Sequence, residues 1–119
     1  MKVAVSALGP SLDDRVDERF GRARWFVVAD TETGEHEALD NDKASQALQG
    51  AGLAAAEFVA DKGVQAVLTG HLGPKAFRLL DLAGIAGYAA AGMTVAEALA
   101  AFRQESLVRL SEAAESYGG

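Results

Sequence analysis

The residues best suited to chemistry follow a short apolar run, Val64–Leu68, which has the composition of a buried central strand. The chain turns at Thr69-Gly70, and Gly73-Pro74 then begins a helix, because proline at the first helical position gives up only an N–H that would have no partner. This turn directs free N–H groups and a helix N-terminus to one point, beside His71 and Lys75. Such an arrangement favours an anion. A tight strand-to-helix connection without any ligand explains the same residues equally well.

A second candidate group lies in the loop Leu8–Arg24, which is rich in Gly, Pro, Asp and Arg. A loop of this length is uncommon in a small domain unless it has a function or a partial helix of its own. Its densest basic part contains Arg19, Arg22 and Arg24, and we predict that these arginines clamp an anionic ligand. The alternative is that the charged residues only solvate the loop. His71 is a candidate hydrogen-bond donor or ligand, although a lone loop histidine is more often simply exposed.

Composition excludes several kinds of protein. The chain has 119 residues, which suits one domain, and its net charge of −6 argues against generic binding to nucleic acid or to an anionic membrane. It has no cysteine, so disulfides, thiolate catalysis and protein-ligated iron–sulfur or structural zinc sites are excluded. We find no signal peptide and no apolar run of membrane-spanning length, so a cytoplasmic location is expected.

Periodicity and end signals predict the elements that must position these residues. Gly63 and Gly84 each follow an apolar helical pattern, where glycine typically ends a helix, and Thr94 with Glu97 forms a capping-box sequence. We expect the segment Asp40–Gln49 to be irregular. The first helix should carry an apolar stripe of Leu48, Ala51, Ala55, Phe58 and Val59. The expected strands are 2–7, 25–30, 35–39, 64–68 and 87–89, and the expected helices run from 48 or 50 to 62, from 74 to 83, and onward from 94.

The order of these elements places the candidate residues at one edge of a sheet. If the first three strands form an antiparallel meander, helical crossovers make the last two strands parallel to the first. Open α/β sheets bind ligands outside the carboxyl ends of their strands. His36 should lie toward the opposite edge, as a surface residue. The loops expected at the ligand edge are Leu8–Arg24, Asp40–Gln49, Gly70–Gly73 and Ala90–Met93.

Two further features are ambiguous. Gly50 and Gly52 superficially match a dinucleotide-binding fingerprint, but they follow a polar loop instead of a first strand. We interpret these glycines as allowing the start of a helix to approach the ligand edge or a neighbouring strand. Met93 lies at a helix entry, where a hydrophobic contact is its plainer role.

Taken together, these motifs resemble the dinitrogenase iron–molybdenum cofactor biosynthesis family, which includes small cofactor carriers of nitrogenase assembly and stand-alone homologues in anaerobes. The resemblance covers nearly the whole chain as one domain, residues 1–119. It is carried by Val16–Phe26, Gly50 with Gly52, Thr69–Ala76, Ala83–Ile85 and Thr94–Leu99.

The resemblance implies an α/β, ribonuclease-H-like fold: a five-stranded mixed sheet in the order 3-2-1-4-5 with three main flanking helices. It also implies non-catalytic binding, storage or delivery of an anionic metal–sulfur cluster, with protein partners in cofactor delivery or an assembly complex. Cysteine-free single-domain members of the family are similar to this chain and hold a molybdenum–copper sulfide cluster without covalent bonds. Other molybdenum–iron–sulfur clusters are also compatible with the family. Carriers of nitrogenase assembly often have histidine where this chain has Arg19, so an electrostatic role replaces a metal-ligating one there.

The chemistry agrees with the resemblance. Soft metals normally require cysteine, but a cluster saturated by its own sulfides requires only positive charge, N–H donors and apolar walls. We therefore name no protein metal ligand. The predicted cofactor-binding residues are Arg19, Phe20, Gly21, Arg22, Arg24, Gly50, Gly52, Gly70, His71, Leu72, Gly73, Lys75 and Met93.

Two other functions would need different features of the chain. Nucleases with this fold need carboxylates from neighbouring strands to hold two divalent metals, and the first and fourth strands contain no acidic residue. A regulatory or interaction module that binds a phosphorylated small molecule or a partner protein at the same edge remains the alternative.

Overall fold

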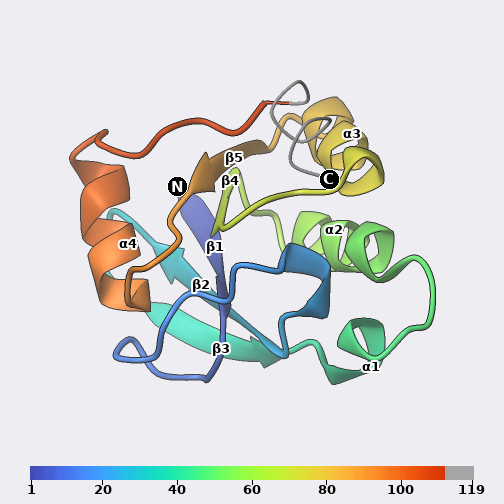
Figure 1. Ribbon diagram of the computed structural model, residues 1–119. Helices are drawn as coiled ribbons and strands as arrows, with labels where there is room; N and C mark the ends of the chain where they lie inside the picture. Colours follow the sequence, from blue (N-terminus) through green and yellow to red (C-terminus); the bar gives the residue numbers. More distant parts are fainter. Residues whose placement is uncertain (112–119) are drawn as a thin grey trace.

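The computed structural model describes residues 1–111, which form one mixed sheet covered by helices on both faces (Figure 1). The strands lie in the order β3-β2-β1-β4-β5, as predicted. β2 is antiparallel to both β1 and β3, whereas β4 is parallel to β1 and β5 is parallel to β4. The strands are β1 (Lys2–Ala7), β2 (Trp25–Asp30), β3 (His36–Asp40), β4 (Ala66–Thr69) and β5 (Ala86–Ala89).

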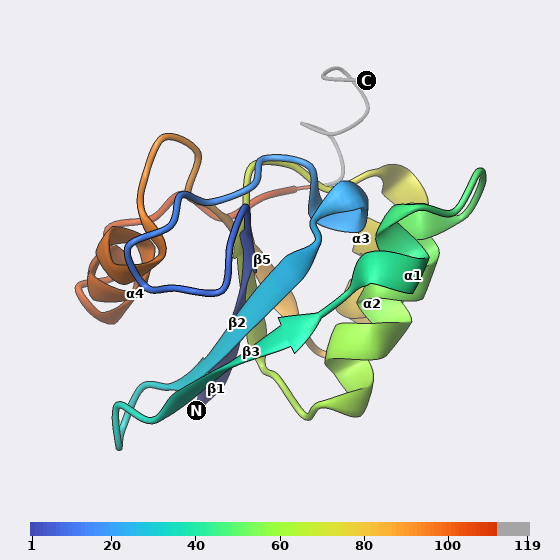
Figure 2. The same cartoon turned by 90° about the horizontal axis from the view of Figure 1, so that it is seen from below.

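The two faces of the sheet bury different helices. Figure 2 shows α4 on one side of the sheet and the other helices on the opposite side. Side chains alternate along β1, so Ala4 packs on the α2 and α3 side while Val3 and Val5 pack on the α4 side. This alternation gives the protein two apolar cores. The helices are α1 (Asp42–Ser45), α2 (Ala51–Asp61), α3 (Pro74–Leu82) and α4 (Val95–Arg103), and a 3₁₀ turn, η1, spans Phe20–Arg22.

Local end signals account for most helix boundaries. Gly84 has a φ of 75° directly after α3, and the N–H of Ile85 donates to the carbonyl oxygen of Leu80 at 2.8 Å, which is the helix-ending arrangement predicted there. Gly63 adopts the same left-handed conformation after α2. At the start of α4, the Thr94 hydroxyl accepts from the Glu97 N–H, and the Glu97 carboxylate accepts from the Thr94 N–H. The capping box is confirmed.

The segment between β3 and α2 differs from its prediction. Residues expected to be irregular contain the short helix α1, and Leu48 is 96% exposed instead of belonging to the apolar stripe of α2. Gly50 explains the difference, because its φ of 75° interrupts the helix and α2 begins only at Ala51. The prediction for Leu48 is therefore wrong.

The residues after α4 lie along the outer edge of β5. The N–H of Ala89 donates to the carbonyl oxygen of Val108 at 2.8 Å, and the N–H of Leu110 donates to that of Gly87 at 2.9 Å. Leu107 and Leu110 pack against the two cores, as expected. The fraying predicted for residues 116–119 lies outside the described residues.

Strand polarity places the carboxyl ends of β1, β3, β4 and β5 at one edge of the sheet. The four loops predicted to carry the site leave the sheet at this edge, and α2, α3 and α4 begin there. Over residues 1–111, no helix is long and apolar enough to cross a membrane.

Candidate functional site: a basic cavity at the sheet edge

The two segments that carry most of the predicted site lie side by side. The N–H of His71 donates to the carbonyl oxygen of Glu18 at 3.1 Å, and Arg19 and His71 form an isolated parallel bridge. Gly70 makes this approach possible, because a Cβ on it would lie 2.5 Å from the Cα of Glu18. The arginine loop and the loop after β4 therefore meet at one edge of the sheet, as predicted.

The buried hydroxyl groups of Ser6 and Thr69 join these two loops on the side of the sheet. The Oγ of Ser6 donates to the carbonyl oxygen of Asp17 at 2.6 Å and lies 2.7 Å from the Oγ1 of Thr69. Ser6 is 1% exposed and Thr69 is not exposed at all. The side chain of Asp17, also buried, accepts the backbone N–H of Arg19 at 3.0 Å. Buried polar groups with satisfied partners fix loop positions, so the backbone around Arg19 is held to the ends of β1 and β4.

A close contact between two glycines brings η1 against the start of α2. A Cβ on Gly21 would lie 2.6 Å from both the Cα and the N atom of Gly52. Backbone can approach backbone this closely only where the side chain is a hydrogen atom. Of the two interpretations offered for Gly52, the structure supports close packing at the ligand edge.

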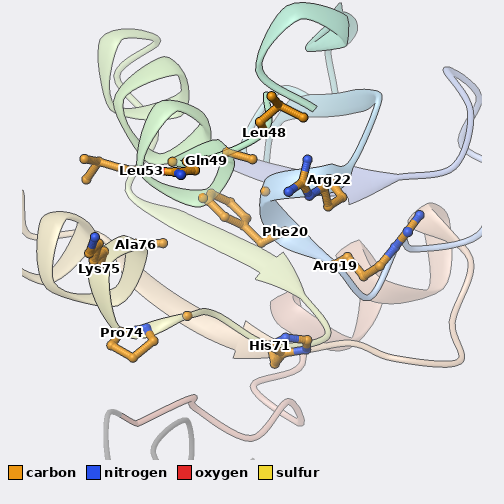
Figure 3. A pocket seen from close by; sticks show the side chains of 15 residues that line it. Arg19, Phe20, Arg22, Leu48, Gln49, Leu53, His71, Pro74, Lys75 and Ala76 are labelled. Carbon is orange, nitrogen blue, oxygen red and sulfur yellow. The ribbon is translucent and has the colours of Figure 1, made fainter. Parts of the chain in front are cut away.

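These segments line an open cavity of about 600 Å³. Its lining contains the cations Arg19, Arg22 and Lys75, together with His71, and no carboxylate. Figure 3 shows these side chains around the opening, with Phe20 near its centre. In a chain of net charge −6, a cavity lined only by cations and neutral groups favours anions. The other lining residues are Phe20, Gly21, Leu48, Gln49, Gly50, Ala51, Gly52, Leu53, Gly73, Pro74 and Ala76.

Two helix N-termini open into the cavity. α2 begins after Gly50 and α3 after Gly73, and neither helix has a side chain that caps its first turn. The first N–H groups of an α-helix have no partner within the helix, and the helix dipole makes this end partly positive. The cavity therefore offers main-chain donors in addition to its charged side chains.

The three predicted arginines occupy different positions. The side chain of Arg19 is 66% exposed, with its Nε 3.4 Å from an Asp17 carboxylate oxygen. Arg22 donates from Nη1 to the carbonyl oxygens of Ser45 and Ala47. Arg24 lies outside the cavity lining, within ion-pair distance of Asp40 and Asp42 and stacked over the ring of Trp25.

The pairing of Arg24 perturbs its partner. A hydrogen bond from the Arg24 guanidinium holds the pKa of the Asp40 carboxyl below its ordinary value, and the same contact raises the pKa of Arg24. The charge of Arg24 is therefore already balanced by its neighbours.

Three other predicted residues also lie outside the cavity lining. Leu72 is 1% exposed and belongs to the core beneath α2 and α3. Met93 packs on the opposite face of the sheet, against the α4 core. Gly70 faces Glu18. Conversely, six lining residues were not predicted as site residues, and the only signal for them was their place in or just after a loop at this edge: Leu48, Gln49, Ala51, Leu53, Pro74 and Ala76.

The donor set does not suit a directly coordinated metal ion. Among residues 1–111, no three His, Asp or Glu side chains converge at metal-binding distance, and the chain has no cysteine. What the cavity offers is positive charge, N–H groups and apolar surface from Phe20, Leu48 and Leu53.

Comparison with known protein families shows the family to which the chain belongs. The family described as "Dinitrogenase iron-molybdenum cofactor" matches residues 1–105. The chain belongs to this family.

Solved structures of relatives agree with this membership in the dinitrogenase iron–molybdenum cofactor family. The apo form of the orange protein from Desulfovibrio gigas is 42% identical, with a TM-score of 0.88 over 91% of each chain. A protein from Thermotoga described as a putative NifB protein is 33% identical, with a TM-score of 0.80 over 91% of each chain. An uncharacterized protein of Methanocaldococcus jannaschii is 28% identical over 90% of this chain and 89% of its own length.

Proposed function

We propose that this protein binds an anionic, molybdenum-containing metal–sulfur cluster in the cavity and stores or delivers it without catalysing a reaction. The observation that carries the proposal is a cavity with three cationic side chains, two uncapped helix N-termini and no carboxylate, in a member of a cofactor-related family. A molybdenum–copper sulfide cluster is the cargo we favour, by the similarity to the orange protein.

The residues fit such a cargo better than a bare metal ion. A cluster whose metals are saturated by sulfide presents a negatively charged outer shell and needs no ligand from the protein. Arg19 and Lys75 can balance its charge, and N–H groups at the starts of α2 and α3 can donate to its sulfides. Apolar surface from Phe20 and Leu53 lies beside these groups, and a cluster bound against it would displace water and strengthen these interactions.

Titration of the purified apo protein with tetrathiomolybdate under anaerobic conditions, followed by copper(I), tests the proposal. We expect visible absorbance to elute with the protein on gel filtration, with molybdenum and copper in a fixed ratio. Exchange of Arg19 and Lys75 for glutamate should weaken binding by about tenfold or more, since charged hydrogen bonds each contribute about 1.5–3 kcal/mol.

A control variant separates local charge from total charge. Exchange of Lys62 and Arg103 for glutamate makes the same change in net charge at the far ends of α2 and α4. This variant should bind as the wild type does, because interactions over more than about 10 Å are screened at 0.1 M salt. Equal losses in both variants, or no binding by the wild type, would contradict the proposal. Saturable binding of inorganic phosphate without thiomolybdate would instead support a site for a phosphorylated small molecule.

A further inference from the structure

One wall of the cavity consists of a segment with little packing of its own. α1 buries none of its four residues, and Leu48, Gln49 and Gly50 that follow it are exposed. A helix this short is not stable by itself. The position of the wall therefore depends on contacts that the rest of the protein makes with it.

Arg22 makes two of these contacts. Its Nη1 lies 3.1 Å from the carbonyl oxygen of Ser45 and 2.5 Å from that of Ala47, so one guanidinium nitrogen fastens both. Other contacts hold the beginning of the segment: the side-chain amide of Asn41 donates to the carbonyl oxygen of Ala23 at 2.9 Å. Arg22 holds its end, where the chain continues into Leu48 and the cavity wall.

We infer that Arg22 is a positioning residue, which holds the wall formed by residues 45–50, while Arg19 supplies charge to the ligand. Arg19 makes a different set of contacts. Its guanidinium lies beside the buried carboxylate of Asp17 and it donates to no backbone carbonyl in the described part of the chain. The ligand part of this inference rests on the proposed function, whereas the structural part does not.

A single spin label can report on the wall. Because the chain has no cysteine, Leu48→Cys provides a unique thiol at an exposed position of the wall, and Leu82→Cys provides one at a similarly exposed position on α3. Each is labelled with a nitroxide in four backgrounds: wild type, Arg22→Gln, Arg22→Lys and Arg19→Gln. The two glutamine variants each remove one positive charge from the cavity lining, so they are matched.

We expect Arg22→Gln to increase nitroxide mobility at position 48 and leave it unchanged at position 82. Arg19→Gln should change neither spectrum. Arg22→Lys should restore part of the order at position 48, because the lysine side chain is longer than that of glutamine and can still bring a donor to a carbonyl oxygen. An unchanged spectrum at position 48 in Arg22→Gln, or an equal change in Arg19→Gln, would overturn the inference. These spectra need no ligand, so they decide the role of Arg22 even if thiomolybdate does not bind.

Binding of tetrathiomolybdate at two salt concentrations then tests the division of roles. At 1 M salt, where the Debye length is about 3 Å, the deficit of Arg19→Gln should shrink to about twofold, because its contribution is charge. The deficit of Arg22→Gln should persist at about fivefold, the equivalent of about 1 kcal/mol, as expected when hydrogen bonds that shape the site are lost. A deficit of Arg22→Gln that disappears with salt would make Arg22 a charged ligand and would contradict the inference.

Discussion

The residues that precede α3 and α4 have nearly the same backbone dihedral angles, but the first turns of the two helices have different hydrogen-bond partners. Gly73 precedes α3 with φ −68° and ψ 163°, and Thr94 precedes α4 with φ −78° and ψ 165°. Both helices begin at the same edge of the sheet, on opposite faces. Thr94 and Glu97 close the first turn of α4, whereas no side chain closes that of α3. The carbonyl oxygens of Asp14 and Leu12 also accept from the N–H groups of Val95 and Ala96 at the start of α4, at 2.8 and 2.9 Å. The start of α4 is therefore finished, with its first N–H groups satisfied, whereas the start of α3 is left open at the cavity.

The largest effect should come from the close contact between Gly21 and Gly52, which forms one side of the cavity. Gly21→Ala places a Cβ within 2.6 Å of the Gly52 backbone, so η1 and α2 must separate. We expect a loss of about 1–3 kcal/mol in the free energy of unfolding, typical of overpacking, together with loss of thiomolybdate binding. Urea denaturation and anaerobic titration measure the two.

Gly73→Ala is the matched control for that substitution. Gly73 lines the same cavity, but a Cβ on it meets no atom within 4 Å. Its stability should stay within about 0.5 kcal/mol of the wild type. Equal stability of the Gly21 and Gly73 variants would mean that the η1–α2 contact tolerates a methyl group and does not define the cavity.

The next effect concerns the finished helix start. Thr94→Ala removes the hydroxyl that accepts from the Glu97 N–H and should lower the free energy of unfolding by about 1 kcal/mol. Thiomolybdate affinity should be unchanged, because α4 lies on the other face of the sheet. Thermal unfolding and titration check this pair of expectations, and a clear loss of affinity would break the separation of the two regions.

A smaller effect should follow from making the open start resemble the finished one. Gly73→Ser supplies a hydroxyl that can accept from the first turn of α3 and should raise stability by a few tenths of a kcal/mol. The hydroxyl would compete with a bound anion for the same N–H groups, so affinity should fall by about two- to tenfold, the equivalent of one hydrogen bond. Wild-type affinity in Gly73→Ser, with Gly73→Ala as reference, would remove these N–H groups from the site.

The smallest effect is a pH dependence at the finished start. Hydrogen bonds from Thr94, first from its backbone N–H and then from its side chain, lower the pKa of the Glu97 carboxyl from its ordinary value of 4.5. A lowered pKa means that this contribution to stability is present above pH 4.5 and is lost as the pH falls through the folded-state pKa. Glu97→Gln should therefore flatten the stability profile in this acidic window. Superimposable wild-type and Glu97→Gln profiles, each relative to neutral pH, would contradict the assignment.

Much of the fold was predictable because its signals are local. Gly84, Thr94 and Glu97 mark helix ends by their own conformations and hydrogen bonds, and the alternation of strands and helices determines which loops share an edge. α1 was missed because nothing in it is buried. The end of α1 is held by Arg22, which is distant in sequence, so no periodic pattern within the segment predicts this helix.

The sequence predicted the edge of the sheet at which the candidate site lies, but it did not predict the face of the sheet. Met93 and Lys75 both follow strands at the correct edge, yet Met93 packs beneath α4 and Lys75 lines the cavity. Arg24 lies outside the cavity because it pairs with Asp40. Asp40 lies opposite Trp25, the neighbour of Arg24, in the pairing of β2 with β3. Such cross-strand neighbours are known only once the register is known.

The segment that lies along β5 also affects how copies of this protein can associate with one another. By covering β5, residues 108–110 leave β3 as the uncovered end of the sheet in the described chain. Uncovered strands invite growth by strand addition, and charged residues such as Glu37 and Asp40 discourage it. Mutual repulsion between acidic molecules fades as the pH approaches the isoelectric point of about 4.8. Aggregation in mild acid should therefore begin at β3, and loss of the covering segment would open a second end.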